Sequence, residues 1–225
     1  MSAILFAGPS LWGSRRPLSR GLVLRPPAGC GDVLRAAAER PAAIGLVDGV
    51  FESGPSVWHK EILAAIAVGV PVLGAASLGA LRAAELDRFG MIGVGAIYAA
   101  YRDGRWTRDD AVMVSHAPPA LGSRPLTVAL VDVAAAVAAA PPADRAALMR
   151  IAAAMNFRDR TWPALRARFA AATGRPLAPL DEQASLKRRD AEALIDRLAM
   201  PIAPPPCRPP PETVFLRGLR RRISS

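Results

Sequence analysis

A predicted helix that starts at residue 57 opens with four side chains of different chemistry: the indole, imidazole, ammonium and carboxylate of Trp58, His59, Lys60 and Glu61. The chain holds only two histidines and two lysines, so this concentration is unusual for it. Ser56, His59 and Lys60, at i, i+3 and i+4, can share one side of a helix. We expect His59 and Lys60 to be catalytic and Ser56 to cap the helix and bind ligand. The alternative is a solvated first turn.

Three polar residues, Ser10, Asp48 and Ser77, come shortly after apolar runs that predict buried strands. Asp48 is a candidate catalytic carboxylate, and its alternative role is to form the turn before Gly49. Ser77 lies where a strand passes into a helix, and backbone N–H groups at such a point favour an anion. We expect Ser77 to be catalytic and Ser10 to bind. A helix N-cap is the alternative for Ser77.

The helix that follows Ser77 carries three more candidates for binding. Gly79 belongs to a run of small residues that would let a substrate approach the backbone closely. Arg82 and Glu85 are three residues apart, so Glu85 can orient an Arg82 guanidinium that holds a carboxylate by two parallel hydrogen bonds. The alternative is a surface ion pair worth only ~0.5 kcal/mol.

The remaining reactive residue types give weaker signals. Cys30 and Cys207 are far apart and lack metal-ligand spacing. The charge of Asp32 would raise the pKa of the Cys30 thiol, which argues against a persulfide there. His116 has no neighbouring motif and is expected to be structural. We expect neither a metal nor an organic cofactor.

Short apolar runs alternate with helical segments of about ten residues, a pattern typical of βαβ units. The predicted strands are residues 3–7, 22–24, 43–47 and 70–74, and the predicted helices are 32–40, 57–68 and 78–86. We therefore predict an α/β fold with a parallel sheet and helices on both faces, of the Rossmann or flavodoxin-like type. Ligands bind such sheets beyond the carboxyl ends of the strands. Ser10, Asp48 and Ser77 should all reach that edge.

The second half of the chain is predicted to be mostly helical. A helix over 92–103 and a last strand over 111–116 should complete the first region. Helices are then expected over 126–140, 145–157, 163–172 and 181–198. Proline occupies seven of the eleven positions 201–211, which predicts an extended tail. The predicted domains are an α/β core over 1–118, a helical region packed on it over 119–200, and a Pro/Arg-rich tail over 201–225.

The net charge of +10 is concentrated in the second half. Residues 1–113 carry 12 basic and 10 acidic side chains, whereas the rest carry 17 and 9. The basic second half lacks interleaved aromatic residues on which bases could stack. Its positive charge therefore favours an acidic protein partner over nucleic acid. No apolar run approaches the roughly 18 uncharged residues that span a bilayer. The short apolar N-terminus is interpreted as a strand and not a signal peptide, so we expect a cytoplasmic protein without membrane contact.

Several stretches, taken in order and spacing, carry a resemblance to a known family. They are Gly8-Pro9-Ser10, Arg25-Pro26-Pro27-Ala28, Gly31-Asp32, Ile44 to Phe51, Pro55 to Leu63, Val72 to Leu86, Phe89 to Gly95 and Tyr101 to Gly104. On these residues the chain resembles the TfuA-like family, named for a protein of trifolitoxin synthesis. The resemblance covers residues 1 to about 130.

The resemblance implies a role beside a YcaO-type enzyme, the ATP-dependent enzyme that modifies peptide backbones. Such pairs are associated with thioamide formation in ribosomally made peptides. The family implies a second partner, a ubiquitin-like sulfur carrier with a thiocarboxylated C-terminus. One hypothesis is that this protein hydrolyses the thiocarboxylate and releases its sulfur. The alternative is a non-catalytic adaptor that docks the YcaO enzyme or its peptide. The sequence leaves the choice and the oligomeric state open.

Three testable expectations follow from these hypotheses. Asp48, His59, Lys60, Ser77 and Arg82 should converge in one cleft at the carboxyl edge of the sheet. Carrier binding should weaken steeply with salt, because a basic C-terminal half would steer an acidic carrier and salt screens such steering. Replacing Arg82 by alanine should weaken binding further, since its guanidinium would grip the terminal carboxylate.

Overall fold

Five short parallel strands form the centre of the molecule. The computed structural model describes residues 2–51, 54–203 and 205–224. The strands are β1 (Ala3–Phe6), β2 (Leu22–Arg25), β3 (Ile44–Leu46), β4 (Val72–Ala75) and β5 (Ile92–Val94). They pair in the order β2-β1-β3-β4-β5, and every pair is parallel. The predicted parallel α/β fold is confirmed, and this order is that of flavodoxin-like sheets.

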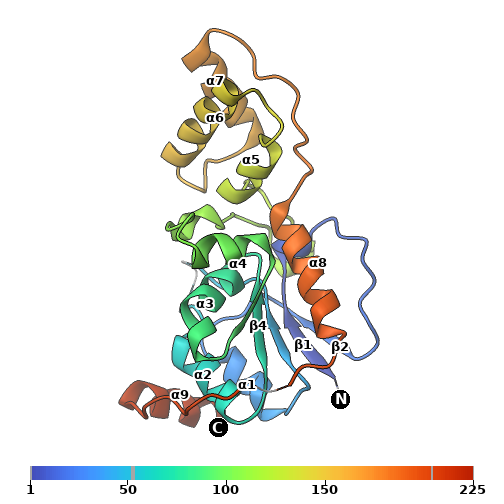
Figure 1. The fold of residues 1–225 in the computed structure, drawn as a ribbon, viewed down its shortest axis with the longest axis vertical. Helices are drawn as coiled ribbons and strands as arrows, with labels where there is room; N and C mark the ends of the chain where they lie inside the picture. The colour runs from blue at the N-terminus through green and yellow to red at the C-terminus, as the bar shows by residue number, and fades with distance from the viewer. Residues whose placement is uncertain (1, 52–53, 204, 225) are drawn as a thin grey trace.

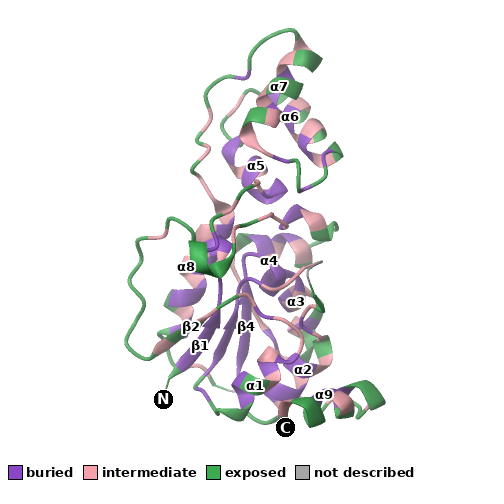
Figure 2. Ribbon diagram, turned by 180° about the vertical axis from the view of Figure 1, so that it is seen from behind, coloured by how far each residue is buried: buried purple, intermediate pink, exposed green. Residues whose placement is uncertain are grey.

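Helices cover both faces of the sheet because successive side chains of a strand point to opposite faces. Ile4 and Phe6 pack in a core with α1 (Asp32–Ala38), α2 (His59–Ala67) and α3 (Leu78–Leu86), which follow β2, β3 and β4. Ala3 and Leu5 pack in a second core against α8 (Leu186–Leu198). Figure 1 shows α8 lying along the strands. The central strands β1, β3 and β4 are buried along their whole length, whereas the edge strands β2 and β5 are not (Figure 2). A helix from the C-terminal region therefore completes the sandwich around the sheet.

The structure corrects two predicted elements of the first region. Residues 92–94 form β5, and only residues 95–102 are helical, as α4 (Gly95–Arg102). The helical prediction over 92–103 was wrong at its start because β5 passes into α4 without a polar turn. Gly95 makes this possible with φ of 94°, and Asp190 of α8 accepts hydrogen bonds from the first amides of α4, Ala96 N at 3.0 Å and Ile97 N at 2.7 Å.

The predicted strand over 111–116 was also wrong. This segment starts in a 3₁₀ turn, Asp109–Ala111, and then runs as an irregular segment with a single antiparallel bridge between His116 and Pro125. Its apolar residues Ala111 and Val112 are buried against helices and not in the sheet. An apolar run is a sign of burial, and here the buried residues pack against helices without pairing with a strand, so the run was mistaken for a strand.

Three helices form a lobe beyond one end of the sheet (Figure 1): α5 (Leu130–Ala136), α6 (Pro142–Ala154) and α7 (Trp162–Thr173). They match three of the four helices predicted after residue 119, and α8 matches the fourth. Leu148 and Phe169 of the lobe share a core with Leu81 of α3 and Ile97 of α4. Burying aliphatic or aromatic side chains of this size contributes about 1.5–3 kcal/mol each. The lobe is thereby packed on the α/β core.

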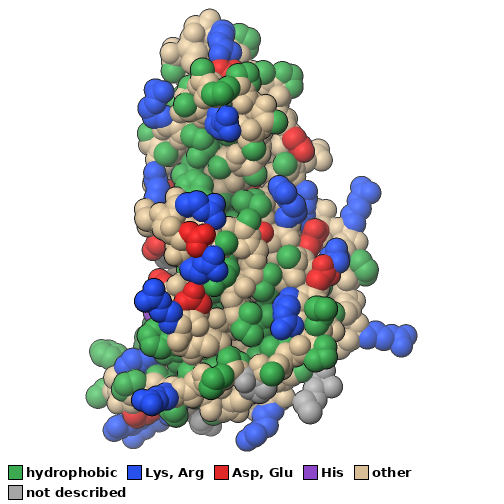
Figure 3. All heavy atoms as spheres, viewed as in Figure 1, with side chains coloured by type: hydrophobic (Ala, Val, Ile, Leu, Met, Phe, Trp, Pro, Cys, Tyr) green, Lys and Arg blue, Asp and Glu red, His purple; other side chains and the backbone are tan. Residues whose placement is uncertain are grey.

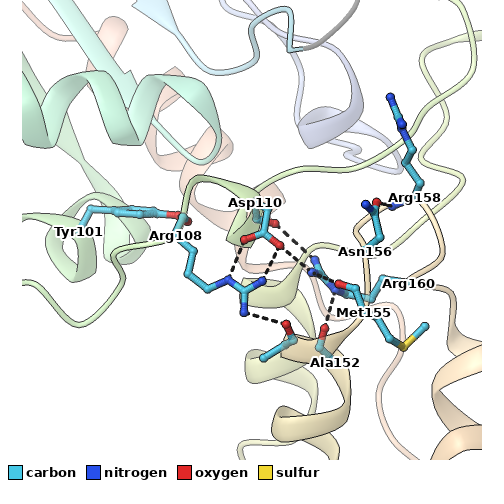
Figure 4. A network of polar contacts seen from close by, with 9 residues as sticks. Tyr101, Arg108, Asp110, Ala152, Met155, Asn156, Arg158 and Arg160 are labelled. Atoms are coloured by element: carbon cyan, nitrogen blue, oxygen red, sulfur yellow. Dashed lines mark hydrogen bonds and ion pairs between the residues drawn. The ribbon is translucent and has the colours of Figure 1, made fainter.

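An arginine network ties the lobe to the segment that follows α4 (Figure 4). The Arg160 side chain is fully buried and donates to the carbonyl oxygens of Ala152 and Met155 and to the Asp110 carboxylate. Arg108 donates two further hydrogen bonds to Asp110. Burial would raise the pKa of Asp110, but the two guanidinium groups hold it below its ordinary value. The network fixes the start of the 112–116 segment.

The tail is extended only in part. Its described residues up to Thr213 lack regular structure, as predicted, but α9 (Val214–Ser224) follows and was not foreseen. Leu216 and Leu219 of α9 are buried, and the Phe215 ring meets that of Trp58 edge to face at 6.4 Å. An apolar residue every three to four positions marks this helix, although the proline run before it hid the signal.

Candidate functional site

Two cavities lie side by side at the carboxyl edge of the sheet. One, of about 530 Å³, is lined by Asp48, Ser77, His116, Arg158 and Lys187 among others. The other, of about 860 Å³, lies towards the lobe and is lined by residues that include Ser10, Asp132 and Trp162. Both are lined by Pro9, Val114 and Lys187. We call the first the sheet cavity and the second the lobe cavity.

Their position follows from the strand order. The chain passes from β1 to β2 on one side of the sheet and from β3 to β4 on the other, so the strand order reverses between β1 and β3. Ligands bind flavodoxin-like sheets at this switch point. Asp48 follows β3 and is 2% exposed. Its Oδ2 accepts hydrogen bonds from the backbone amides of Gly8 at 2.8 Å and Ser10 at 3.0 Å, while Oδ1 accepts from the Ser10 hydroxyl at 2.6 Å. Asp48 therefore holds the loop after β1 across the switch point.

Ser77 occupies the N-cap position of α3 but makes no side-chain capping bond, so its hydroxyl is not used to cap the helix. The preceding residue, Ala76, has a left-handed backbone with φ of 66°, which is strained for a residue with a Cβ. The left-handed conformation of Ala76 turns the chain sharply between β4 and α3. Ser77 is 5% exposed and lines the sheet cavity.

Gly79 has a packing reason in this structure. A Cβ on Gly79 would lie 1.7 Å from the carbonyl oxygen of Leu46, so only glycine lets α3 approach β3 this closely. The Gly79 amide also donates to Val47 O at 3.1 Å. These contacts place the start of α3, and with it Ser77, at the sheet edge.

Lys187 and Asp132 form the wall shared with the lobe. Asp132 of α5 is buried and accepts hydrogen bonds from the Ser185 hydroxyl and the Lys187 amide. Burial raises the pKa of Asp132, although the Lys187 charge and these bonds oppose the rise. The Lys187 ammonium donates to Val112 O at 2.7 Å. Sequence reasoning missed Lys187, because a lone lysine beside two arginines gives no sign of burial.

His116 lies on the exposed rim of the sheet cavity. Its Nδ1 is 2.8 Å from Ala117 O. A carbonyl can only accept, so in the neutral ring Nδ1 carries the proton and Nε2 is left as a proton acceptor. His116 was expected to be structural because no motif adjoins it in the sequence. The structure places it with Asp48 and Ser77.

A second group of predicted residues lies outside both cavities, between α2 and α3. Glu85 Oε2 accepts hydrogen bonds from His59 Nε2 at 2.8 Å and from Arg82 Nη1 at 2.7 Å. Arg82 also donates to Val57 O at 3.0 Å and to the Ser56 hydroxyl at 3.4 Å. Burial raises the pKa of Glu85, but His59 and Arg82 outweigh it and hold that pKa below its ordinary value. We call this group the exposed cluster.

The start of α2 differs from its prediction. The helix begins at His59 with Trp58 as N-cap, so Ser56 does not cap it and the predicted cap was wrong. The buried Glu61 takes that task, since its carboxylate accepts from Trp58 N at 2.7 Å and Gly31 N at 2.9 Å. Burial raises the pKa of Glu61 to about 7, against the effect of these bonds. Lys60 is partly exposed and lines neither cavity.

The structure thus divides the residues expected in one cleft. Asp48 and Ser77 share the sheet cavity, with Ser10 beside them in the lobe cavity. His59, Lys60 and Arg82 do not line it. Ser77 and Glu85 are eight residues apart along α3, which corresponds to about 12 Å along a helix axis. Of the five residues expected in one cleft, only Asp48 and Ser77 line the sheet cavity.

The described residues offer neither a metal site nor a reactive thiol. They contain no group of three or more His, Cys, Asp or Glu side chains placed to hold a metal ion. Cys30 and Cys207 are free thiols, and burial followed by the charge of Glu61 raises the pKa of Cys30. Over the same ranges, no helix has the length and apolar content needed to cross a membrane.

The fold and the site define a flavodoxin-like α/β protein with paired cavities at the switch point of its sheet. A family model described as TfuA-like protein matches residues 48–161, half of the chain. The chain belongs to the TfuA-like family, in agreement with the resemblance of its sequence. The matched residues include Asp48, Ser77 and His116, which line the sheet cavity. No curated protein matches the chain.

Proposed function

We propose that this protein is an accessory protein of ribosomal-peptide backbone thioamidation. It engages a ubiquitin-like sulfur carrier, hydrolyses the thiocarboxylate at the carrier's C-terminus and supplies sulfide to a YcaO-type enzyme. Membership of the TfuA-like family supports the accessory role beside a YcaO enzyme. The observation that carries hydrolysis is the sheet cavity, which brings an imidazole, a hydroxyl and an ammonium together from His116, Ser77 and Lys187.

The reaction is a substitution at a carbonyl carbon. The oxygen of a water molecule forms a bond to that carbon, and the carbon–sulfur bond breaks. Sulfur leaves as hydrogen sulfide with the two protons of the water, and the carrier keeps a carboxylate. Such a step needs a base for the water and donors for the oxyanion that forms on the carbonyl oxygen.

His116 suits the role of base, because its neutral ring presents Nε2 as an acceptor at the rim of the cavity. The start of α3 at Ser77 suits the oxyanion, because backbone N–H groups at a helix start favour negative charge. Asp48 is less suited to take a proton than expected, since both its oxygens already accept hydrogen bonds. His59 and Lys60, predicted to be catalytic from the sequence, line neither cavity, so this proposal gives them no part in the hydrolysis.

The test uses the purified full chain and a thiocarboxylated ubiquitin-like carrier. We expect sulfide to appear faster than from the carrier alone, and mass spectrometry to show sulfur replaced by oxygen at the carrier's C-terminus. Water labelled with ¹⁸O should place the label in the new carboxylate. Sulfide release only when the YcaO enzyme and its peptide are present would contradict hydrolysis by this chain.

The adaptor role is a second candidate, and the exposed cluster favours it. The side chains of His59 and Glu85 are 48% and 43% exposed, lie outside both cavities and present an imidazole and a carboxylate to a partner. An adaptor would use this surface to dock the YcaO enzyme. Reversing one charge, Glu85→Arg, should then weaken YcaO binding while sulfide release from the carrier is unchanged.

Steering of an acidic carrier by the basic second half stays part of the proposal. On the face drawn in Figure 3, Lys and Arg side chains are spread along the whole molecule. Charge spread over a surface raises the rate of association with an oppositely charged partner and does not strengthen one particular contact. Salt shortens the Debye length from about 10 Å at 0.1 M to about 3 Å at 1 M, so association should slow and carrier binding should weaken as salt is added. A salt titration of carrier affinity checks this.

A further inference from the structure

Lys187 is a buried ammonium set between the two cavities. It lies in the first turn of α8, is 3% exposed, and belongs to the lining of both cavities. Lysine is almost never buried to this extent unless it is paired. The position of Lys187 at the shared wall therefore needs a reason beyond packing.

The hydrogen bonds of Lys187 leave most of its donors unused. An ammonium has three N–H donors, and among the described residues this one donates only to Val112 O, at 2.7 Å. Asp48 and Asp132 act on it through their charge. Their carboxylate oxygens accept hydrogen bonds from other groups, namely Gly8, Ser10, Ser185 and the Lys187 backbone amide.

This arrangement is unfavourable for a protein that binds nothing there. Burial lowers the pKa of Lys187, and only the charges of Asp48 and Asp132 counteract it. A buried charge with unused donors costs free energy that a residue such as methionine would avoid. The two remaining N–H donors can bind the terminal oxygen or sulfur of a carboxylate or thiocarboxylate, whose negative charge the ammonium attracts as a point charge.

The acidic residues of the linings do not prevent an anion from binding. The Asp48 carboxylate accepts hydrogen bonds from two backbone amides and the Ser10 hydroxyl, and the Asp132 carboxylate accepts from the Ser185 hydroxyl and the Lys187 amide. Glu182 in the lobe cavity is paired with Arg166. Arg15 and Arg188 also line the lobe cavity, and Arg158 lines the sheet cavity. The cationic side chains of the two linings thus outnumber the acidic ones.

We propose that Lys187 is the anion-binding group of this site and holds the terminal carboxylate or thiocarboxylate of a peptide tail at the shared wall of the two cavities. The inference rests on the proposed function for the identity of the tail. It also assigns to Lys187 the grip that the sequence suggested for Arg82, whose guanidinium is already bound to Glu85, Val57 O and Ser56.

The experiment compares the affinity of the full chain for a ubiquitin-like carrier ending in a free carboxylate and for the same carrier ending in an amide. Wild type should prefer the carboxylate by about tenfold or more. Lys187→Met should lose this preference and keep the affinity for the amide form. Arg189→Met, which removes an exposed charge from the same helix outside both linings, should keep it.

A measurement on the wild-type chain covers the case in which Lys187→Met fails to fold. The chain has two lysines, so isotope-labelled lysine gives two side-chain NMR signals. The Lys187 signal should move on addition of the carboxylate carrier and not of the amide carrier. An unmoved Lys187 signal with bound carboxylate carrier, or an unchanged preference in Lys187→Met, overturns the inference. If the chain neither binds the carrier nor releases sulfide, the proposed function fails as well.

Discussion

The two groups of polar residues in this molecule, the sheet cavity and the exposed cluster, are built in opposite ways. At the cavity, buried side chains such as Asp48 bond to the backbone of distant segments. In the exposed cluster, half-exposed side chains such as His59 and Glu85 bond mainly to one another. Buried polar groups are costly to leave unpaired, whereas exposed ion pairs contribute little. Substitutions should therefore act on stability in the first region and on partner binding in the second.

The largest effect on stability is expected from Asp48→Ala. It leaves the buried amide of Ser10 and the part-buried amide of Gly8 without their acceptor; a fully buried unsatisfied donor costs ~1–3 kcal/mol, and a part-buried one costs less because water can reach it. We expect a loss of roughly 2–4 kcal/mol in the free energy of unfolding, measured by urea denaturation.

Asp48→Asn is the matched control, because its amide oxygen can still accept from both backbone N–H groups and its amide nitrogen can donate to Ser10 Oγ. We expect Asp48→Asn to be nearly as stable as wild type. Loss of sulfide release in a stable Asp48→Asn would give Asp48 the catalytic role that its hydrogen bonds argue against. Equal, small losses of stability in both variants would contradict its role in holding the loop.

The second effect is a pH dependence that arises at Glu61. Burial raises its pKa to about 7 in the folded chain, whereas the ordinary value is 4.5. Between these values the folded chain keeps a proton that the unfolded chain has lost. The contribution to stability is thus fully present below pH 4.5 and is lost as the pH rises through 7.

We expect the wild type to lose roughly 1–3 kcal/mol of stability across this window relative to Glu61→Gln. The measurement is urea unfolding of both proteins between pH 4.5 and 8. Parallel stability curves would show that Glu61 does not titrate with a raised pKa.

The smallest effect is expected from Glu85→Gln. Its partners are half-exposed or bonded elsewhere, and an exposed ion pair contributes about 0–1 kcal/mol. Stability should change by less than about 0.5 kcal/mol and should respond little to salt. A loss as large as that of Asp48→Ala would remove the contrast between the two regions.

The sequence predicted four of the five strands, the carboxyl edge of the sheet and the approach of Ser10, Asp48 and Ser77 to that edge, because strand and helix periods are local signals. It did not predict that His59 and Arg82 lie apart from Asp48. The position of Arg82 depends on how far along α3 it lies from the sheet edge, and that of His59 depends on the face of α2 that it occupies. Lys187 and His116 were missed for a similar reason, since the return of α8 to the sheet and the path of residues 112–116 are set by tertiary packing alone.

The most direct test of the sheet cavity as the reaction site is a comparison of the chain's two histidines. Sulfide release from a thiocarboxylated carrier is measured for wild type, His116→Gln and His59→Gln at saturating carrier. We predict that His116→Gln lowers the rate by about 10²-fold or more, as expected for loss of a general base, while His59→Gln keeps a rate near that of wild type. A rate that falls in His59→Gln and persists in His116→Gln would place the chemistry in the exposed cluster and contradict the assignment to the cavity.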